Sequence, residues 1–487
     1  MSSVKQRQGR NAAKGPAPTL TPFDVTSLVV GAVVGADIYV VASLGAGLMG
    51  PAMLAAWALA GAMAGFIAMS FAQCVAIVPR AGGPYAYARE AFGYFPGFLV
   101  GWSLYVAELV TIAIFPVAFV RYLSFFLPEL TWWEDVLAKA AFVAFLTITN
   151  YFGARVAGKV NDILTVAKLG PLFLLVVLGT VVAILNPGSA LSNLAPFTPL
   201  GWDALGQTII LAFWAYGGFE LAVLPAMDIV DPPRTLPVAI ARGMAIVAVL
   251  YLSVNAIVVL AMPWTQLAGS TAPLADAMQT IAQTLSLPWW GIGGAIMALG
   301  AIISISGADE SATLGTSRLA YAMAADGYLP HQLTRLHPVY GTPYVSLALQ
   351  GVFALIASLI GSFTGLIGLA VFLASIAYLG TVFAAVRLVS RSPRRRLRFA
   401  GSRFALLLAL GSCMYLISQA GLRTALLGVA ALALGTAIYV YFAPKSELLA
   451  VKDSILSQEQ RVAVVQRALL VAPAYALRRI QDFITRR

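Results

Sequence analysis

Charged residues are scarce in this chain. Only 10% of its 487 residues are Asp, Glu, Lys or Arg, whereas soluble proteins carry about a quarter. Hydrophobic residues make up 60%, and the mean hydropathy is +0.86. So few charges cannot cover the surface of a soluble domain of this length, which excludes a water-soluble globule. Lipid must therefore be the main solvent of the protein.

Cysteine and histidine are almost absent as well. The two cysteines, Cys74 and Cys413, both lie inside apolar runs, so they form neither a disulfide framework nor a metal-ligand motif, and we expect inert buried thiols. The two histidines, His331 and His337, share one segment between apolar runs, and neither HExxH nor GxSxG occurs. No catalytic residue, metal or cofactor is predicted, which disfavours an intramembrane enzyme.

Long apolar runs are what the chain does contain. A hydrocarbon core about 30 Å thick requires roughly 20 apolar residues per helix. Runs of about that length, ended by charge or proline, number twelve: 23–48, 51–78, 95–127, 136–153, 160–186, 204–228, 238–262, 287–325, 344–362, 364–389, 402–420 and 423–443. The sequence therefore predicts an all-α integral membrane protein with about twelve transmembrane helices.

The basic residues are distributed unequally between the two sides of this arrangement. If the N-terminus is cytoplasmic, the inner segments hold 27 of the 31 Lys and Arg residues, and only Arg121, Lys139, Lys168 and Arg423 remain. The formal charge of +11 thus follows the positive-inside rule and does not indicate a nucleic-acid partner. We expect a multi-pass protein of the plasma membrane, the inner membrane in a bacterium, with both termini in the cytoplasm.

The two ends of the chain are basic. The apolar segment after residues 1–21 lacks a small-residue cleavage site and is too long for a signal peptide, so the N-terminus should remain uncleaved. Residues 444–487 mix Leu and Val with Lys and Arg, which suits either a helix on the anionic inner leaflet or a solvated tail.

Two of the apolar runs are interrupted by glycine. The first contains Gly31, Gly35 and Asp37, and the sixth contains Gly217-Gly218-Phe219-Glu220. Each interruption places one carboxylate two residues after a glycine. Transporters bind solutes where membrane helices unwind, since freed backbone groups can then act as ligands, although close helix packing also selects glycine. The repeated glycine-carboxylate pair favours two broken helices that open two five-helix repeats.

Four segments resemble the amino acid-polyamine-organocation superfamily of permeases over residues 21–443. They are Gly35-Ala36-Asp37-Ile38-Tyr39, the segment Gly82-Gly83-Pro84-Tyr85-Ala86-Tyr87 through Phe92-Gly93, Phe213 to Glu220 followed by Asp231-Pro232-Pro233-Arg234-Thr235-Leu236-Pro237, and Ser317 to Pro330. The resemblance implies a five-plus-five inverted repeat with broken helices 1 and 6, alternating access, and a midplane site between helices 1, 3, 6 and 8. It divides the chain into a transport core over residues 22–390, helices 11 and 12 over 391–443, and the two tails.

Ionisable residues at membrane depth are candidates for function because each costs at least about 2.5 to 3.5 kcal/mol to insert. Six occur: Asp37, Glu108, Lys168, Glu220, Asp309 and Glu310. The resemblance places Lys168 where proton-coupled relatives have a lysine near the broken part of helix 1. Its ammonium would replace a sodium ion and donate to freed carbonyls, although a lysine near a helix end can also snorkel to the surface.

The remaining acidic residues have several candidate roles. Glu108 would relay protons or bind a cation, or form a structural pair with another helix. Glu220 matches a family position that stabilises the broken helix, which is the role we expect. Asp309 and Glu310 could pair with a cation or a polar helix end. Ser304 and Ser306 would supply hydroxyls near Lys168, or serve only in packing.

These considerations predict a site without catalytic residues. Substrate would contact Gly35, Ala36, Asp37, Ile38, Glu108, Phe213, Trp214, Gly217, Gly218 and Glu310, and coupling would involve Lys168, Ser304 and Ser306. The rings of Phe213 and Trp214 could close over a bound solute or contact its cation.

Asp37 departs from the family, whose usual glycine leaves backbone amides open to a substrate carboxylate. A carboxylate side chain there would repel such a group and attract an ammonium. We hypothesise a substrate with an amine but no free α-carboxylate, such as a monoamine or polyamine, with Glu108 or Glu310 meeting a second positive charge. The alternative is a protonated Asp37, or one paired with Lys168, with ordinary amino acids as substrates.

The function predicted from the sequence is secondary active transport of amino acids or related amines and polyamines, coupled to protons or driven by exchange. The alternatives are an amino-acid-binding sensor built on a transporter fold, or an intramembrane enzyme. The expected partners are the small-molecule substrate, protons and membrane lipid, with no nucleic acid, and homo-oligomer formation is left open.

Overall fold

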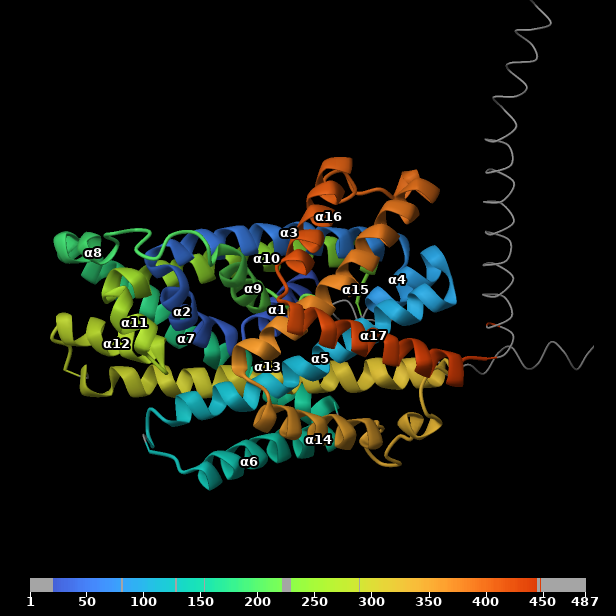
Figure 1. The fold of residues 1–487 in the computed structure, drawn as a ribbon, viewed down its shortest axis with the longest axis horizontal. Helices are drawn as coiled ribbons and strands as arrows, with labels where there is room; N and C mark the ends of the chain where they lie inside the picture. The colour runs from blue at the N-terminus through green and yellow to red at the C-terminus, as the bar shows by residue number, and fades with distance from the viewer. Residues whose placement is uncertain are drawn as a thin grey trace, which may run out of the picture.

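The structure is a computed structural model that describes residues 21–79, 82–127, 129–152, 154–220, 229–288, 290–444 and 447. Every regular element in these residues is an α-helix or a short 3-10 helix (Figure 1). Both predicted tails lie outside the described residues, apart from their first or last few positions. The all-α class predicted from the sequence is confirmed.

The helices follow one another with short connections. The first nine α-helices are α1 (Pro22–Val33), α2 (Asp37–Met49), α3 (Met53–Ile77), α4 (Gly83–Phe92), α5 (Tyr94–Leu123), α6 (Trp132–Tyr151), α7 (Ala154–Leu185), α8 (Pro187–Asn193) and α9 (Leu205–Ala215). The others are α10 (Pro232–Ala261), α11 (Trp264–Gly269), α12 (Pro273–Thr284), α13 (Gly293–Ala325), α14 (Tyr344–Ile360), α15 (Phe363–Arg391), α16 (Arg403–Ser418) and α17 (Leu422–Phe442). Single 3-10 turns are η1 (Gly50–Ala52), η4 (Trp290–Ile292), η5 (His331–Thr334) and η6 (Pro393–Arg395).

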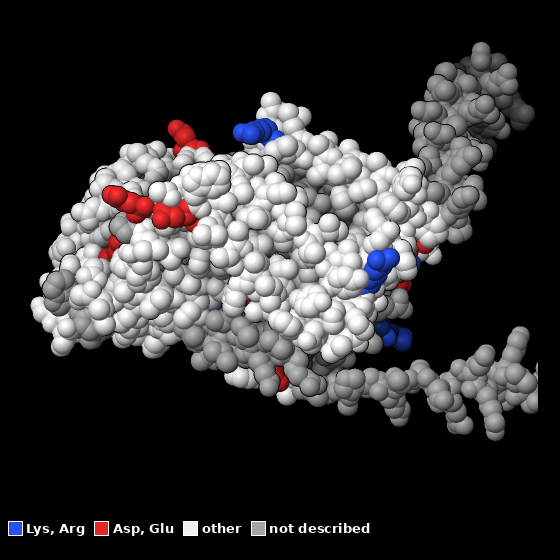
Figure 2. Space-filling model, turned by 90° about the horizontal axis from the view of Figure 1, so that it is seen from below, with Lys and Arg blue, Asp and Glu red and all other residues white. Residues whose placement is uncertain are grey.

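Each of the twelve predicted spans contains helix, but the number of crossings stays a prediction. In the described residues, seven helical stretches are long and apolar enough to cross a membrane. Four of the other predicted spans contain shorter apolar helices, namely α1, α9, α14 and α16, and the fifth contains α6. Uncharged residues cover most of the face drawn in Figure 2, as a lipid-facing surface requires.

The centre of the bundle is formed by α5, α13 and α15. In their most apolar stretches 78% of the residues of α5 are buried, against 61% for α13 and α15 and 17% for α17. Figure 1 shows α6 and α14 together along one side of the bundle. The low burial of α17 agrees with the prediction that the last predicted span lies outside the core.

The first predicted span is broken in two. Thr21 and Asp24 form a capping box at the start of α1, with Asp24 Oδ2 accepting from Thr21 N at 2.8 Å. The helix ends at Val33, because Val34 adopts an extended conformation, and α2 begins at Asp37. The backbone therefore unwinds at residues 34–36, as the glycine pattern predicts.

The sixth predicted span is interrupted after α9. The helix ends at Ala215, and Gly218 has φ +104°, which favours glycine. A Cβ atom on Gly218 would lie 2.6 Å from the carbonyl oxygen of Ala32, so the two interruptions are in direct contact. The second half of this span, residues 221–228, lies outside the described residues.

The bundle has two distinct ends. Figure 1 shows α8, α11 and α12 at one end and α4 at the other. The carboxyl ends of α3, α13 and α15 all lie at the α4 end: Arg395 contacts the Ile77 carbonyl at 3.3 Å, Arg89 of α4 binds Asp326, and Arg391 reaches α4. The basic segment 387–403 is therefore at the end that the positive-inside rule predicts to be cytoplasmic.

Cysteine labelling can test this orientation. Gly269 at the end of α11 and Arg394 in η6 are both exposed, at opposite ends of the bundle, and the native Cys74 and Cys413 are buried. We expect Gly269→Cys to react with an impermeant maleimide added outside intact cells, and Arg394→Cys to react only after permeabilisation. Labelling of Gly269→Cys from the cytoplasm alone would show that the predicted orientation is inverted.

Candidate functional site

A cavity of about 60 Å³ lies where the two interrupted helices meet. This is well above the roughly 10–15 Å³ that a single water needs, so the cavity suits a small solute. Five helical regions contribute to its wall: the α1–α2 break, α5, α9 with the turn after it, α13 and α15. The lining residues are Ala32, Val33, Gly35, Asp37, Ala107, Glu108, Thr111, Phe115, Phe213, Trp214, Gly217, Gly218, Glu220, Ala308, Ala312, Ala370, Val371, Ala374 and Tyr378.

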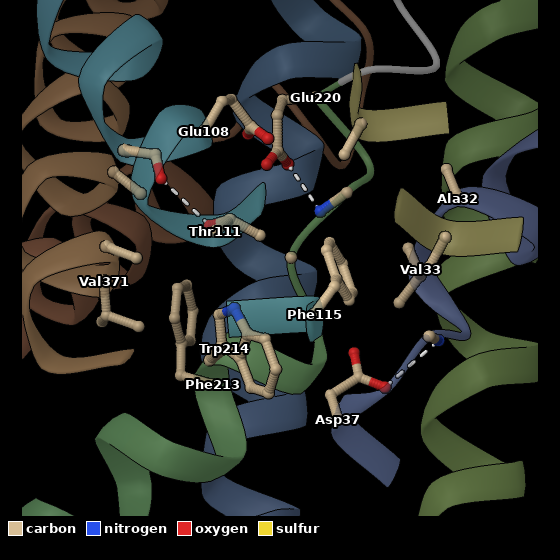
Figure 3. Close-up of a pocket in the computed structure, with 18 of the residues that line it drawn as sticks. Ala32, Val33, Asp37, Glu108, Thr111, Phe115, Phe213, Trp214, Glu220 and Val371 are labelled. Carbon is tan, nitrogen blue, oxygen red and sulfur yellow. Dashed lines mark hydrogen bonds between the residues drawn. The ribbon is translucent and has the colours of Figure 1, made fainter. Parts of the chain in front are cut away.

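Asp37 binds the backbone of its own break. Its Oδ1 atom accepts hydrogen bonds from Ile38 N at 2.6 Å, from Gly35 N at 3.1 Å and from the Tyr251 hydroxyl at 3.2 Å. The carboxylate thus lies at the amino end of α2, where unpaired amides and the helix dipole favour an anion. In Figure 3 the second oxygen of Asp37 points into the cavity.

Glu220 repeats this arrangement in the other half of the protein. Its Oε2 atom accepts from Gly218 N at 3.1 Å, which is the same two-residue spacing and the same distance as Asp37 to Gly35. In each break, the backbone amide of the glycine therefore donates to the carboxylate two residues later. The glycine-carboxylate pair that the sequence repeats thus makes the same backbone contact in both breaks.

Glu108 of α5 lies against Glu220 (Figure 3). The two carboxyl groups lie next to each other, and Tyr378 of α15 also lines the cavity. Two buried carboxyl groups side by side repel each other when both are ionised, which favours a proton on one of them. The cavity therefore has Asp37 at one end and two adjacent carboxyl groups at the other.

Lys168 lies behind the first break and is fully buried. Its ammonium donates to the carbonyl of Gly31 at 2.5 Å and to that of Val34 at 2.7 Å, the groups freed where α1 ends. Ser304 of α13 donates to the neighbouring carbonyl of Gly35 at 3.3 Å. Lys168 and Asp37 do not form an ion pair among those seen in the described residues.

Aromatic rings separate the two acidic ends of the cavity. Phe213 and Trp214 are 2% and 7% exposed, and their rings lie 6.3 Å from those of Tyr378 and Phe115 respectively. Such rings can pack on an apolar solute or contact a cation through their faces.

Some predicted residues lie elsewhere. Ala36 and Ile38 are buried beside the break but do not line the cavity, although the Ile38 amide binds Asp37. Glu310 faces α6, where it accepts from Thr149 at 2.8 Å. Ser306 donates to the Ile302 carbonyl of its own helix at 2.8 Å, so its hydroxyl is not directed to Lys168.

Other residues that line the cavity were not selected from the sequence. Thr111 and Phe115 follow Glu108 at helical spacings of three and seven, so they lie on the same face of α5 and that periodicity could have identified them. Tyr378 carries no comparable signal, because no break or charge marks that part of α15 in the sequence. Glu220 was assigned only a stabilising role, yet its carboxyl group also lines the cavity.

Comparison with known proteins places this chain in a family. The family described as "Amino acid permease" matches residues 20–455. The branched-chain amino acid permease BcaP of Bacillus subtilis (strain 168) is 27% identical over 88% of this chain and 93% of its own. The methylthioribose transporter of the same organism is 26% identical over 90% and 96%, and its serine/threonine exchanger SteT is 27% identical over 75% and 82%. The chain therefore belongs to the amino acid permeases of the amino acid-polyamine-organocation superfamily, and it is a multi-pass membrane transport protein and not an enzyme.

Proposed function

We propose that this protein is a secondary active transporter whose substrate is a small organic amine without a free α-carboxylate. It works by alternating access, is driven by protons or by exchange, and requires no sodium. The observation that carries the proposal is the position of Asp37, whose carboxylate occupies the backbone amides of the first break.

The charges of the cavity support a cationic substrate. The lining residues include three acidic side chains, Asp37, Glu108 and Glu220, and no Lys or Arg among the described residues. A substrate carboxylate would meet the Asp37 carboxylate at the amides it needs, and no Lys or Arg of the described residues lines the cavity to bind it. An ammonium group could instead bind the second oxygen of Asp37, and a second amino group could lie near Glu108.

The names of the relatives leave the substrate open. At 26–27% identity they are described as carriers of branched-chain amino acids, of methylthioribose, and of serine and threonine. Relatives this distant therefore differ in substrate chemistry, and the residues of the cavity are the better guide.

The coupling proposal rests on Lys168 and the carboxyl pair. The Lys168 ammonium contacts two carbonyls of the break, where a sodium ion would otherwise be coordinated. A proton on Glu108 or Glu220 would lie beside the substrate cavity, so its loss or gain would change the charge that a bound amine meets.

Competition assays test the substrate. Purified protein in vesicles should exchange a labelled amine, and unlabelled amines should inhibit this exchange while the parent α-amino acids compete about a thousandfold more weakly. Inhibition by amino acids but not by their decarboxylated amines would refute the proposed substrate. Binding without any flux would refute transport itself.

A Glu108→Gln variant tests the proton pair. Glutamine is close to glutamic acid in size but cannot release a proton, so accumulation driven by a pH gradient should fall to equilibrium while amine exchange continues. Asp309→Asn is the matched control, because Asp309 is also buried but does not line this cavity. Unchanged gradient-driven accumulation in Glu108→Gln would exclude this pair from coupling.

A further inference from the structure

A second pocket, of about 740 Å³, opens at the α4 end of the bundle. It lies between α4, the start of α5 and the carboxyl ends of α13 and α15. Its wall includes Arg89, Phe92, Tyr94, Asp326, Arg387 and Arg391. None of these residues belongs to the substrate cavity, so the pocket is a separate feature.

Three guanidinium groups converge on this pocket. Arg387 and Arg391 are one helical turn apart on α15, a spacing at which like charges repel. Arg387 lies 5.3 Å over the ring of Phe92, and Arg391 donates to the Glu90 carbonyl at 3.5 Å. Because an arginine has five N–H donors, both side chains retain donors for a ligand.

The net charge of the pocket fits a single negative charge. Its three arginines oppose two carboxylates, Glu90 and Asp326, which leaves a formal charge of +1. Phosphodiesters carry one negative charge, and their paired oxygens match the forked donors of arginine. Free phosphate, which is partly a dianion at neutral pH, would be matched less well.

The position of the pocket indicates where such a group would come from. Phe92 and Tyr94 are 38% and 41% exposed beside the arginines, as aromatic residues are at the membrane–water interface. The basic segment 387–403 begins with Arg387 in the wall of the pocket, on the side predicted to face the anionic leaflet. We propose that this pocket binds the phosphodiester headgroup of an anionic phospholipid.

Lipid binding here would act on a contact between helices. Arg89 of α4 donates to Asp326 at 2.6 Å, and Tyr85 donates to the same carboxylate, so the end of α13 is tied to α4. A phosphodiester beside Arg89 competes with Asp326 for that guanidinium. It thereby loosens the end of the helix whose middle part lines the substrate cavity, and anionic lipid accelerates transport.

Native mass spectrometry of the full-length protein tests the site. In mixed micelles, the wild type should retain phosphatidylglycerol but not phosphatidylcholine. The double variant Arg387→Gln/Arg391→Gln should bind phosphatidylglycerol about thirtyfold more weakly. Arg394→Gln/Arg396→Gln is the matched control, since these arginines lie at the same end but do not line the pocket, and it should bind as the wild type does.

Transport rates provide an independent readout. Replacing phosphatidylcholine by phosphatidylglycerol in the vesicles should speed amine exchange severalfold in the wild type and the control, but not in Arg387→Gln/Arg391→Gln. Three results would overturn the proposal: equal phosphatidylglycerol loss in both double variants, equal retention of the two lipids, or the same acceleration from inorganic phosphate in phosphatidylcholine vesicles. The last would assign the pocket to free phosphate.

Discussion

The Asp37→Gly variant is expected to bind α-amino acids that the wild type rejects, and to bind the corresponding amines more weakly. Removing the side chain frees the amides of Gly35 and Ile38, which donate to Asp37 at 3.1 and 2.6 Å. A substrate carboxylate can then accept those hydrogen bonds at the amino end of α2, where the helix dipole favours it. The amine loses the carboxylate that attracts it.

The expected change in selectivity is large. Two like charges about 4 Å apart at an effective dielectric near 20 repel by about 4 kcal/mol, which is about a thousandfold in affinity. The measurement is the ratio of inhibition constants for an α-amino acid and its decarboxylated amine, determined side by side in the wild type and the variant.

An Asp37→Asn variant separates charge from hydrogen bonding. Asparagine keeps an oxygen that can accept from Gly35 and Ile38, so the amides stay occupied while the negative charge is lost. We therefore expect weaker amine binding without a gain in amino-acid binding. If Asp37→Asn gains amino-acid binding as fully as Asp37→Gly, charge alone sets selectivity, and the occupied amides play no part.

The sequence predicted the break sites because their signals are local. Gly35 with Asp37 and Gly218 with Glu220 repeat one short pattern, and in the structure each carboxylate binds the amide of its own glycine. A contact between groups two positions apart in the chain depends mainly on the local backbone conformation. For this reason the interruptions of the first and sixth spans could be located without knowledge of the packing.

The faces of long helices were harder to predict. Glu310 was expected in the site, but Ala308 and Ala312 are the residues of α13 that line the cavity. Residue 310 is two positions from each, so it lies on the opposite side of the helix, toward Thr149. Polar and apolar residues alternate irregularly around α13. Its sequence therefore does not reveal which face of the helix meets the break.

Lys168→Ala should abolish coupled accumulation of substrate. The ammonium donates to Gly31 and Val34, and its removal leaves two buried carbonyls without a donor, at a cost of about 1–3 kcal/mol each. The end of α1 is then no longer held in one position by a group that can gain or lose a proton. Accumulation in vesicles with an imposed proton gradient should fall to the equilibrium ratio.

Lys139→Ala provides the matched control for Lys168→Ala. Lys139 is 8% exposed, but its ammonium pairs with Asp135 at 2.7 Å on α6, far along the chain from either break. Loss of this lysine should leave accumulation intact, so a shared defect would indicate general destabilisation and not coupling.

Because the ammonium of Lys168 already satisfies the carbonyls that a sodium ion would need, wild-type uptake should be the same in sodium and in choline buffers. A strict sodium requirement in the wild type would contradict the assignment of Lys168 to the cation site, whatever the variants do.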